Sequence, residues 1–189
     1  MKINEILRKV KDNLSNERYE HTLRVIQTAK KLAKIHGINV EKVELASALH
    51  DYAKCEDKLT LKQYIIDNNL DKNLLNYHHE LWHGPVAAHF TEYTLGIKDK
   101  EVINAIKYHT TGRAHMGFVE LTVFIADFIE PARQIPGVDS VREAAKENLN
   151  EAALLELKGT ITHLVSKDAT IYPGTIEAYN DLINLKGDR

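Results

Sequence analysis

The 189-residue chain is 43% hydrophobic, enough to bury one core, so a single domain over residues 1–189 is expected. Its formal net charge of −2 at pH 7 provides no basic surface, which argues against nucleic acid or a membrane as a partner. One cysteine, Cys55, excludes a disulfide framework and a zinc–thiolate cluster and fits a reducing, cytoplasmic location. No apolar stretch approaches the ~18 residues that a membrane span requires.

The N-terminal half of the chain shows helical periodicity and clear capping residues. Helices are predicted over residues 2–14, about 16–36, about 40–54 and 60–68, followed by a less regular segment at 71–83. Ser15 and Asn39 are predicted to cap the second and third helices, and Gly37 to follow the end of the second. His21 falls on the apolar stripe of the second helix, so its side chain is expected to face the core.

The C-terminal half continues the helical pattern. Gly84-Pro85 is typical of a helix start, because proline fits the first turn, and this helix is predicted to end near Leu95-Gly96. Further helices are predicted over residues 99–109, 118–130, 140–148, 150–167 and about 174–185, with a loop at 110–117. The sequence shows no alternating strand pattern, internal repeat or linker. It therefore predicts an all-α, single-domain helical bundle.

Two carboxylates stand in strongly apolar helical surroundings. His50 and Asp51 are the groups able to carry charge near neutral pH in residues 45–53, and burying them costs several kcal/mol unless something pairs with them. An adjacent imidazole nitrogen and carboxylate oxygen can bind one metal ion. Asp127 interrupts an apolar helix in the same way, and its alternative role is an ion pair with an arginine such as Arg133.

Together these residues form a candidate metal site. Each histidine taken alone is more often a hydrogen-bonded core residue than a ligand, but the set of two histidines and two carboxylates comes from three helices: His21, His50, Asp51 and Asp127. This set suits a hard to borderline divalent metal, and it leaves coordination positions for water, as catalytic centres do. His83 and His109 lie at helix ends, where they could bind a second metal, contact phosphate or act as a proton donor.

The order His21, His50-Asp51, Asp127 resembles the HD-domain metal-dependent phosphohydrolases, which are all-helical. More narrowly, the chain resembles the YqeK family, symmetrical bis(5′-nucleosyl)-tetraphosphatases. Five ordered motifs carry this resemblance over nearly the whole chain: residues 18–21, 49–54, 83–84, 108–113 and 126–133. The sequence departs from the family pattern after Arg113, where it reads Ala-His-Met-Gly, and at Gly174, where an aspartate is expected.

The resemblance implies an enzyme that contains iron, as one or two ions, and that hydrolyses diadenosine tetraphosphate to two ADP. Manganese and magnesium are alternative metals, ADP or GDP would be product-like ligands, and a homodimer is an open question. A metal held by the four ligands would activate water, with Asp51, His83 and His109 as catalytic residues. The expected substrate contacts are Arg18, Lys54, His83, His109, Thr111, Arg113, Arg133 and Tyr172.

Two alternatives stay open at this point. The first is an HD phosphohydrolase that acts on another nucleotide, such as a deoxynucleotide, a guanosine alarmone or a cyclic dinucleotide. The chain lacks the Gly-Tyr-Pro motif of the cyclic-dinucleotide enzymes. The second is a non-catalytic sensor that binds a nucleotide through the same metal site.

Overall fold

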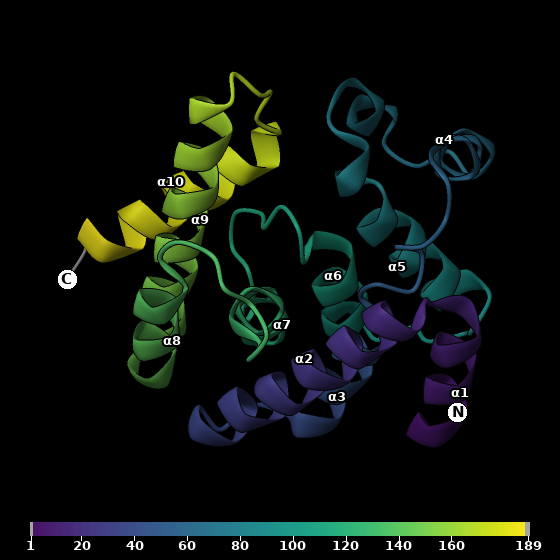
Figure 1. Ribbon diagram of the computed structural model, residues 1–189, viewed down its shortest axis with the longest axis horizontal. Coiled ribbons are helices and arrows are strands. Elements are labelled where there is room, and N and C mark those ends of the chain that lie inside the picture. The colour runs from purple at the N-terminus through teal and green to yellow at the C-terminus, as the bar shows by residue number, and fades with distance from the viewer. Residues whose placement is uncertain (1, 188–189) are drawn as a thin grey trace.

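The computed structural model describes residues 2–187, and over that range the chain is helical without a strand, which confirms the all-α prediction (Figure 1). The helices are α1 (Ile3–Asn13), α2 (Asn16–Ile35), α3 (Val40–Leu49), α4 (Lys58–Asp67), α5 (His83–Tyr93), α6 (Lys100–Tyr108), α7 (Phe118–Ile129), α8 (Val138–Glu147), α9 (Leu149–Ser166) and α10 (Pro173–Gly187). Two short 3-10 helices, η1 (Lys72–Asn76) and η2 (His79–Leu81), occupy the segment predicted to be less regular.

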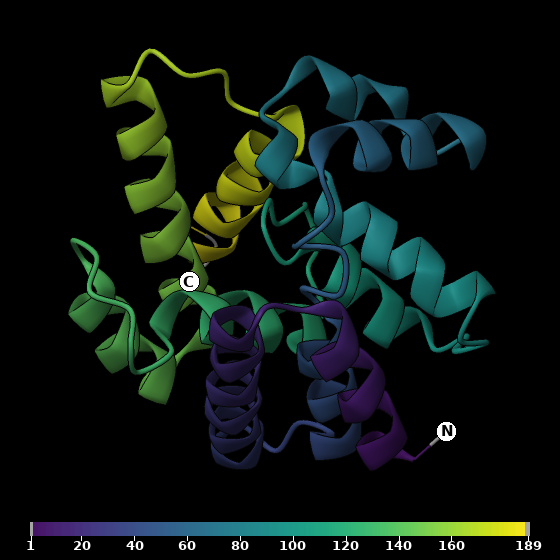
Figure 2. The same cartoon turned by 45° about the vertical axis from the view of Figure 1, so that its right-hand side comes forward.

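Helix α7 lies at the centre of the bundle. It packs against α2, α3, α6, α8 and α9, and the views in Figures 1 and 2 place α8–α10 on one side of it and α4–α6 on the other. Its sequence is apolar on almost every face, and a helix of that kind is stable where it is surrounded by protein. Asp127 belongs to this central helix, which places its side chain within the bundle.

The predicted capping residues hold the helix ends. The Ser15 side chain accepts from the backbone N–H of Arg18 at 3.2 Å and begins α2, and the Asn39 side chain begins α3 in the same way. Gly37, with φ of +66°, follows the end of α2, a left-handed conformation that glycine adopts without strain. Among the described residues, no helix is both long and apolar enough to cross a membrane.

One predicted boundary is wrong in a way that matters for the site. The third helix ends at Leu49 rather than near residue 54, so His50 is its C-cap and Asp51 lies in the following turn. After Leu49 the backbone forms tighter turns, with Tyr52 N–H bonded to the Leu49 carbonyl and Lys54 N–H to that of Asp51, and the Asn13 side chain donates to the Tyr52 carbonyl at 2.5 Å across 39 residues. His50 and Asp51 therefore both lie at the C-terminal end of α3.

Candidate metal centre

The four predicted metal ligands converge at the centre of the bundle. His21 from α2, His50 and Asp51 from the end of α3, and Asp127 from α7 are brought together although the chain separates them by up to about a hundred residues. His21 Nε2 lies 3.0 Å from Asp127 Oδ1 and 3.6 Å from Asp51 Oδ2, and His50 Nε2 lies 3.3 Å from Asp51 Oδ2. One ligand atom each from His21, His50 and Asp127 lies within 4.8 Å of the others.

His83 and His109 join this cluster on the far side of Asp51. His83 Nε2 lies 3.1 Å from Asp51 Oδ1, and His109 Nε2 lies 3.8 Å from the same oxygen. The two Nε2 atoms of His83 and His109 are 3.0 Å apart. His50, Asp51 and His109 form a second group whose ligand atoms lie within 4.8 Å of one another. Asp51 therefore stands between two sets of imidazoles.

Main-chain carbonyls fix which ring nitrogen of three histidines carries the proton. Nδ1 of His50, His83 and His109 donates to the carbonyl three residues earlier, at 2.7, 2.7 and 2.8 Å, from Ser47, Glu80 and Ile106. A carbonyl can only accept, so the proton of a neutral ring lies on Nδ1 and the lone pair lies on Nε2. All three Nε2 atoms point at the Asp51 carboxylate, which is the arrangement of metal-binding histidines.

The donor set fits a divalent metal. Nε2 of His21 and Nε2 of His50 are buried and lack a hydrogen-bond partner, although a buried polar atom normally has one. Imidazole nitrogens and carboxylate oxygens, without a thiolate, are ligands for a hard to borderline divalent ion. A cation bound between these atoms would satisfy both nitrogens and neutralise both carboxylates. The site therefore fits a divalent metal held by His21, His50, Asp51 and Asp127.

Local electrostatics keep the carboxylates ionised and His109 neutral. Burial disfavours ionisation of Asp51, but the positive charge of His50 and the close approach of the His50 and His83 rings hold its pKa well below the usual range. Burial likewise opposes ionisation of Asp127, while the contact with His21 Nε2 at 3.0 Å and the His50 charge lower its pKa. Burial, and then the charges of His50 and His83, lowers the pKa of His109 to about 3. Ionised carboxylates and a neutral His109 are the charge states that metal binding requires.

A carboxylate that the sequence interpretation assigned no role orients His21. Glu130 Oε1 lies 3.2 Å from His21 Nδ1, so Nδ1 is occupied and Nε2 turns to the metal site. Glu130 Oε2 accepts from Arg24 Nε at 2.7 Å and from the backbone N–H of Ala132 at 2.8 Å. The signal available in the sequence was position: Glu130 follows Asp127 by three residues, just past the end of the same buried helix.

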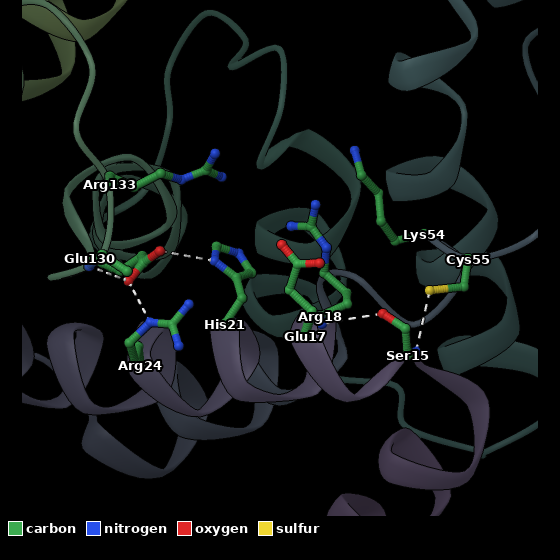
Figure 3. A pocket seen from close by; sticks show the side chains of 10 residues that line it. Ser15, Glu17, Arg18, His21, Arg24, Lys54, Cys55, Glu130 and Arg133 are labelled. Atoms are coloured by element: carbon green, nitrogen blue, oxygen red, sulfur yellow. Dashed lines mark hydrogen bonds and ion pairs between the residues drawn. The ribbon is translucent and has the colours of Figure 1, made fainter.

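A cavity of about 440 Å³ opens over His21 and carries three of the predicted substrate contacts, Arg18, Lys54 and Arg133 (Figure 3). Arg18 Nη1 lies 2.9 Å from Asp51 Oδ2, and Arg133 Nη2 lies 3.0 Å from Asp127 Oδ1. The arginine pair considered as an alternative to metal binding by Asp127 is thus present together with the ligand cluster. Arg24 also lines the cavity, and the sequence interpretation missed it.

The other predicted substrate contacts lie outside this cavity. Arg113 is held by Glu120 through two bonds, Nε–Oε2 at 2.7 Å and Nη2–Oε1 at 2.6 Å. Thr111 is buried, and its hydroxyl donates to the carbonyl of Gly112. Thr111 and Tyr172 share a separate cavity of about 90 Å³. A role for these three residues in substrate binding stays a prediction.

Close packing of α5 on α6 sets the His83–His109 pair. A Cβ at Gly84 would lie 2.9 Å from the carbonyl oxygen of Lys107, 3.2 Å from that of Ile106 and 3.4 Å from His109 Cε1. Glycine therefore lets the start of α5 approach the backbone of α6 directly. Gly84 thus allows the close packing that places its neighbour His83 beside His109.

Comparison with known proteins places these observations in a family context. The HD domain family model matches residues 18–157. The chain is 44% identical to a protein of Halalkalibacterium halodurans named symmetrical bis(5′-nucleosyl)-tetraphosphatase, over 94% of this chain and 95% of that protein. Proteins of the same name from Bacillus subtilis and Staphylococcus aureus are 40% and 44% identical, each over 95% of this chain and over 97% and 94% of their own lengths.

The fold has a close match among solved structures. A crystal structure from Clostridium acetobutylicum, described as a predicted HD superfamily hydrolase involved in NAD metabolism, superposes with a TM-score of 0.92. The two proteins are 35% identical, and the match covers 98% of each chain.

Proposed function

The chain belongs to the HD-domain family, and within it to the symmetrical bis(5′-nucleosyl)-tetraphosphatases, and from this membership we propose that it hydrolyses diadenosine tetraphosphate to two molecules of ADP. The observation that carries the proposal beyond family membership is the cavity over His21. Four cationic side chains line it, and so does His21, which belongs to the buried group of metal-type donors. Hydrolysis of a polyphosphate needs cations on its oxygens and a metal beside the phosphorus under attack; this cavity provides the cations and adjoins the candidate metal site through His21.

We propose that iron is the native metal, held by His21, His50, Asp51 and Asp127. When bound, the metal supplies Lewis-acid activation of water and of a phosphoryl oxygen. Glu130 would keep the His21 ring in place, and the carbonyls behind His50 would keep its lone pair directed into the site. The family resemblance favours iron, and the donor set is also compatible with manganese or magnesium.

Arg18 and Arg133 are proposed to hold the phosphates. Each guanidinium has five N–H donors, and the ion pairs with Asp51 and Asp127 account for only part of them. The remaining donors can bind phosphate oxygens in the two-pronged geometry that arginine favours. Lys54, which pairs with Glu80, would add a point charge at the other wall of the cavity.

His83 and His109 are proposed to bind a second cation or to contact phosphate. The Nδ1–H of His109 is used by the Ile106 carbonyl, so the neutral ring has a lone pair to offer and no proton to donate. With a pKa of about 3, His109 fits a ligand better than an acid near neutral pH. His83 Nε2 lies closer to the Asp51 carboxylate, at 3.1 Å, so we assign donation to the leaving diphosphate to His83 rather than to His109.

The cut is proposed to fall at the central bridge of the tetraphosphate. Water attacks the phosphorus on one side of the central bridging oxygen, and the ADP on the other side leaves with that oxygen. In-line displacement needs alignment tighter than one phosphate spacing, so a single product pair is expected rather than a mixture.

The test is metal analysis followed by a substrate panel. Protein loaded with iron or manganese is incubated with diadenosine tetraphosphate, mononucleotides and deoxynucleotides, and the products are separated by chromatography. ADP as the sole nucleotide product supports the proposal, and oxygen-18 water should label one of the two ADP molecules per turnover. ATP plus AMP would overturn the symmetrical cut, and turnover restricted to a mononucleotide would overturn the substrate.

Three further properties are proposed with it. Residues 1–189 are inferred to form one domain, because the family model spans helices from both ends of the bundle. A cytoplasmic location is inferred from the free Cys55, which suits a reducing compartment. A homodimer stays a prediction, and light scattering on the purified protein would test it.

A further inference from the structure

Cationic side chains flank His21 on both sides of the cavity. In Figure 3, Arg24 and Arg133 lie on one side of His21, and Arg18 and Lys54 lie on the other. The cavity follows α2 from Ser15 to Arg24, nine residues and therefore roughly 13 Å of helix. A polyphosphate centred on His21 thus meets positive charge in both directions, as a substrate with two equal halves requires.

A second cavity begins at Lys54. It has a volume of about 240 Å³, and its lining includes Lys54, His79, Glu80 and His83. Lys54 lines both cavities, and His83 connects the second one to the metal centre, where its Nε2 lies 3.1 Å from Asp51. A polyphosphate that extends from His21 toward Lys54 would therefore reach this second cavity.

The two cavities differ in charge. Around the first, the cations Arg18, Arg24, Lys54 and Arg133 outnumber the carboxylates Glu17 and Glu130 by two. Around the second, three carboxylates, Glu56, Asp57 and Glu80, face two lysines. Phosphates would be repelled from the second cavity, whereas an uncharged nucleoside would not be. Its sugar hydroxyls can donate to a carboxylate such as Glu80.

His79 offers a ring on which a base can stack. Its side chain is 39% exposed, and the ring is held by His78 at 4.5 Å and by Trp82 at 6.2 Å between centroids. Aromatic and histidine rings bind nucleobases through their faces with little preference for which base is present.

We propose that one nucleoside of the dinucleotide binds in the cavity lined by His79 and Glu80, with Lys54 holding the diphosphate that leads to it. The other half then lies on the Arg133 side of His21. This inference rests on the proposed function, since it assigns one half of the same substrate. It explains how the site would tell a dinucleotide from a mononucleotide, because a second nucleoside has its own cavity.

The experiment compares His79→Ala with His79→Phe in the metal-loaded enzyme. His79→Ala is expected to lower kcat/KM for diadenosine tetraphosphate about tenfold, the effect of losing one stacked base. His79→Phe keeps a ring and should restore most of the loss. Inhibition by inorganic tripolyphosphate, which lacks a nucleoside, should be the same in wild type and both variants. His163→Ala, at an exposed histidine of α9, is the matched control and should resemble wild type.

Metal content and thermal unfolding are measured for every variant, so that a loss of the fold is recognised. A kcat/KM within twofold of wild type in His79→Ala would overturn the inference while leaving the proposed function intact. Equal weakening of tripolyphosphate would also overturn it, since His79 would then act on phosphates or on the fold. Failure of the wild type to cleave diadenosine tetraphosphate would instead contradict the proposed function itself.

Discussion

Glu130 Oε1 lies 3.2 Å from His21 Nδ1, and the same carboxylate binds Arg24 and the backbone of Ala132. Burial opposes ionisation of Glu130, but the bonds from Arg24 and Ala132 hold its pKa below the usual value, so it is a carboxylate. His21 is thereby fixed on the side away from the metal. The orientation of one proposed metal ligand therefore depends on a residue outside the proposed ligand set.

Glu130→Gln is expected to weaken metal binding by roughly ten- to a hundredfold, because it removes the charge behind His21. Titration of the metal-free protein with Mn²⁺ or Fe²⁺ measures this. Glu147→Gln, at an exposed residue of α8, is the control. An unchanged dissociation constant would show that Glu130 does not support the site.

Asp51→Ala is expected to abolish metal binding and activity together, because one Asp51 oxygen lies near His21 and His50 and the other lies near His83. The fold should survive, since the residue lies in the turn after α3. Elemental analysis and circular dichroism give the two readouts. Stoichiometric metal with near-normal turnover would contradict the ligand assignment.

Arg133→Ala and His109→Ala should affect different kinetic constants. Arg133→Ala is expected to raise KM about tenfold with a smaller change in kcat, because it removes phosphate binding common to ground and transition states. His109→Ala should lower kcat about a hundredfold or more, since His109 lies within the centre. Arg8→Ala, on the exposed face of α1, is the control. Equal effects of both variants on both constants would refute this division.

Gly84→Ala is expected to lower the free energy of unfolding by about 1–3 kcal/mol and to reduce activity. The new methyl group would meet the Lys107 carbonyl oxygen at 2.9 Å, so α5 and α6 must separate and carry His83 away from His109. Gly159→Ala in α9, where a Cβ meets nothing within 4 Å, should instead be neutral or stabilising. Urea denaturation compares the two, and equal stability changes would argue against tight α5–α6 packing.

Glu156 gives the protein a predictable pH dependence. Burial, and then the nearby Asp127 carboxylate, raises the pKa of Glu156 well above its usual value of 4.5. The folded state therefore holds this proton more tightly than the unfolded state, and its contribution to stability, complete below pH 4.5, is lost as pH rises toward the folded pKa.

Glu156→Gln cannot ionise and should remove that loss. In the metal-free protein the variant is expected to be more stable than wild type at pH 8 and similar to it at pH 4. The difference should grow by at most about 1.4 kcal/mol per pH unit. Denaturation curves across this range measure it, with Glu147→Gln as the exposed control. A parallel pH dependence in the variant and wild type would contradict a buried neutral Glu156.

Local patterns in the sequence predicted most of the fold, because helix caps and apolar periodicity are local. Ser15, Asn39 and Gly37 act where their chemistry indicates. Periodicity also placed His21 and Asp127 inward, and the structure brings them within 3.0 Å of each other. The end of α3 was mispredicted: the apolar pattern continues to Ala53, but the backbone turns after Leu49, where Asn13, 39 residues away, binds the Tyr52 carbonyl.

The rest of the site depends on contacts between distant segments. The sequence does not reveal that Glu130 backs His21 across 109 residues, or that Arg113 is held by Glu120 instead of facing the metal cavity. Residue type and motif position suggested Arg18, Arg113 and Arg133 alike as phosphate contacts and left out Arg24. The structure distinguishes them. Arg18 and Arg133 line the cavity and keep unused N–H donors, whereas Arg113 lies outside it and is bound by Glu120.

The three carbonyl anchors behind His50, His83 and His109 have a consequence for how this protein can diverge. The acceptors belong to the main chain of Ser47, Glu80 and Ile106, so the proton position does not depend on which side chain those residues carry. Relatives can accumulate substitutions at these three positions without shifting the imidazole protons, provided that the local backbone path is kept. Selection on ring tautomer therefore falls on backbone geometry rather than on the side chains at these positions.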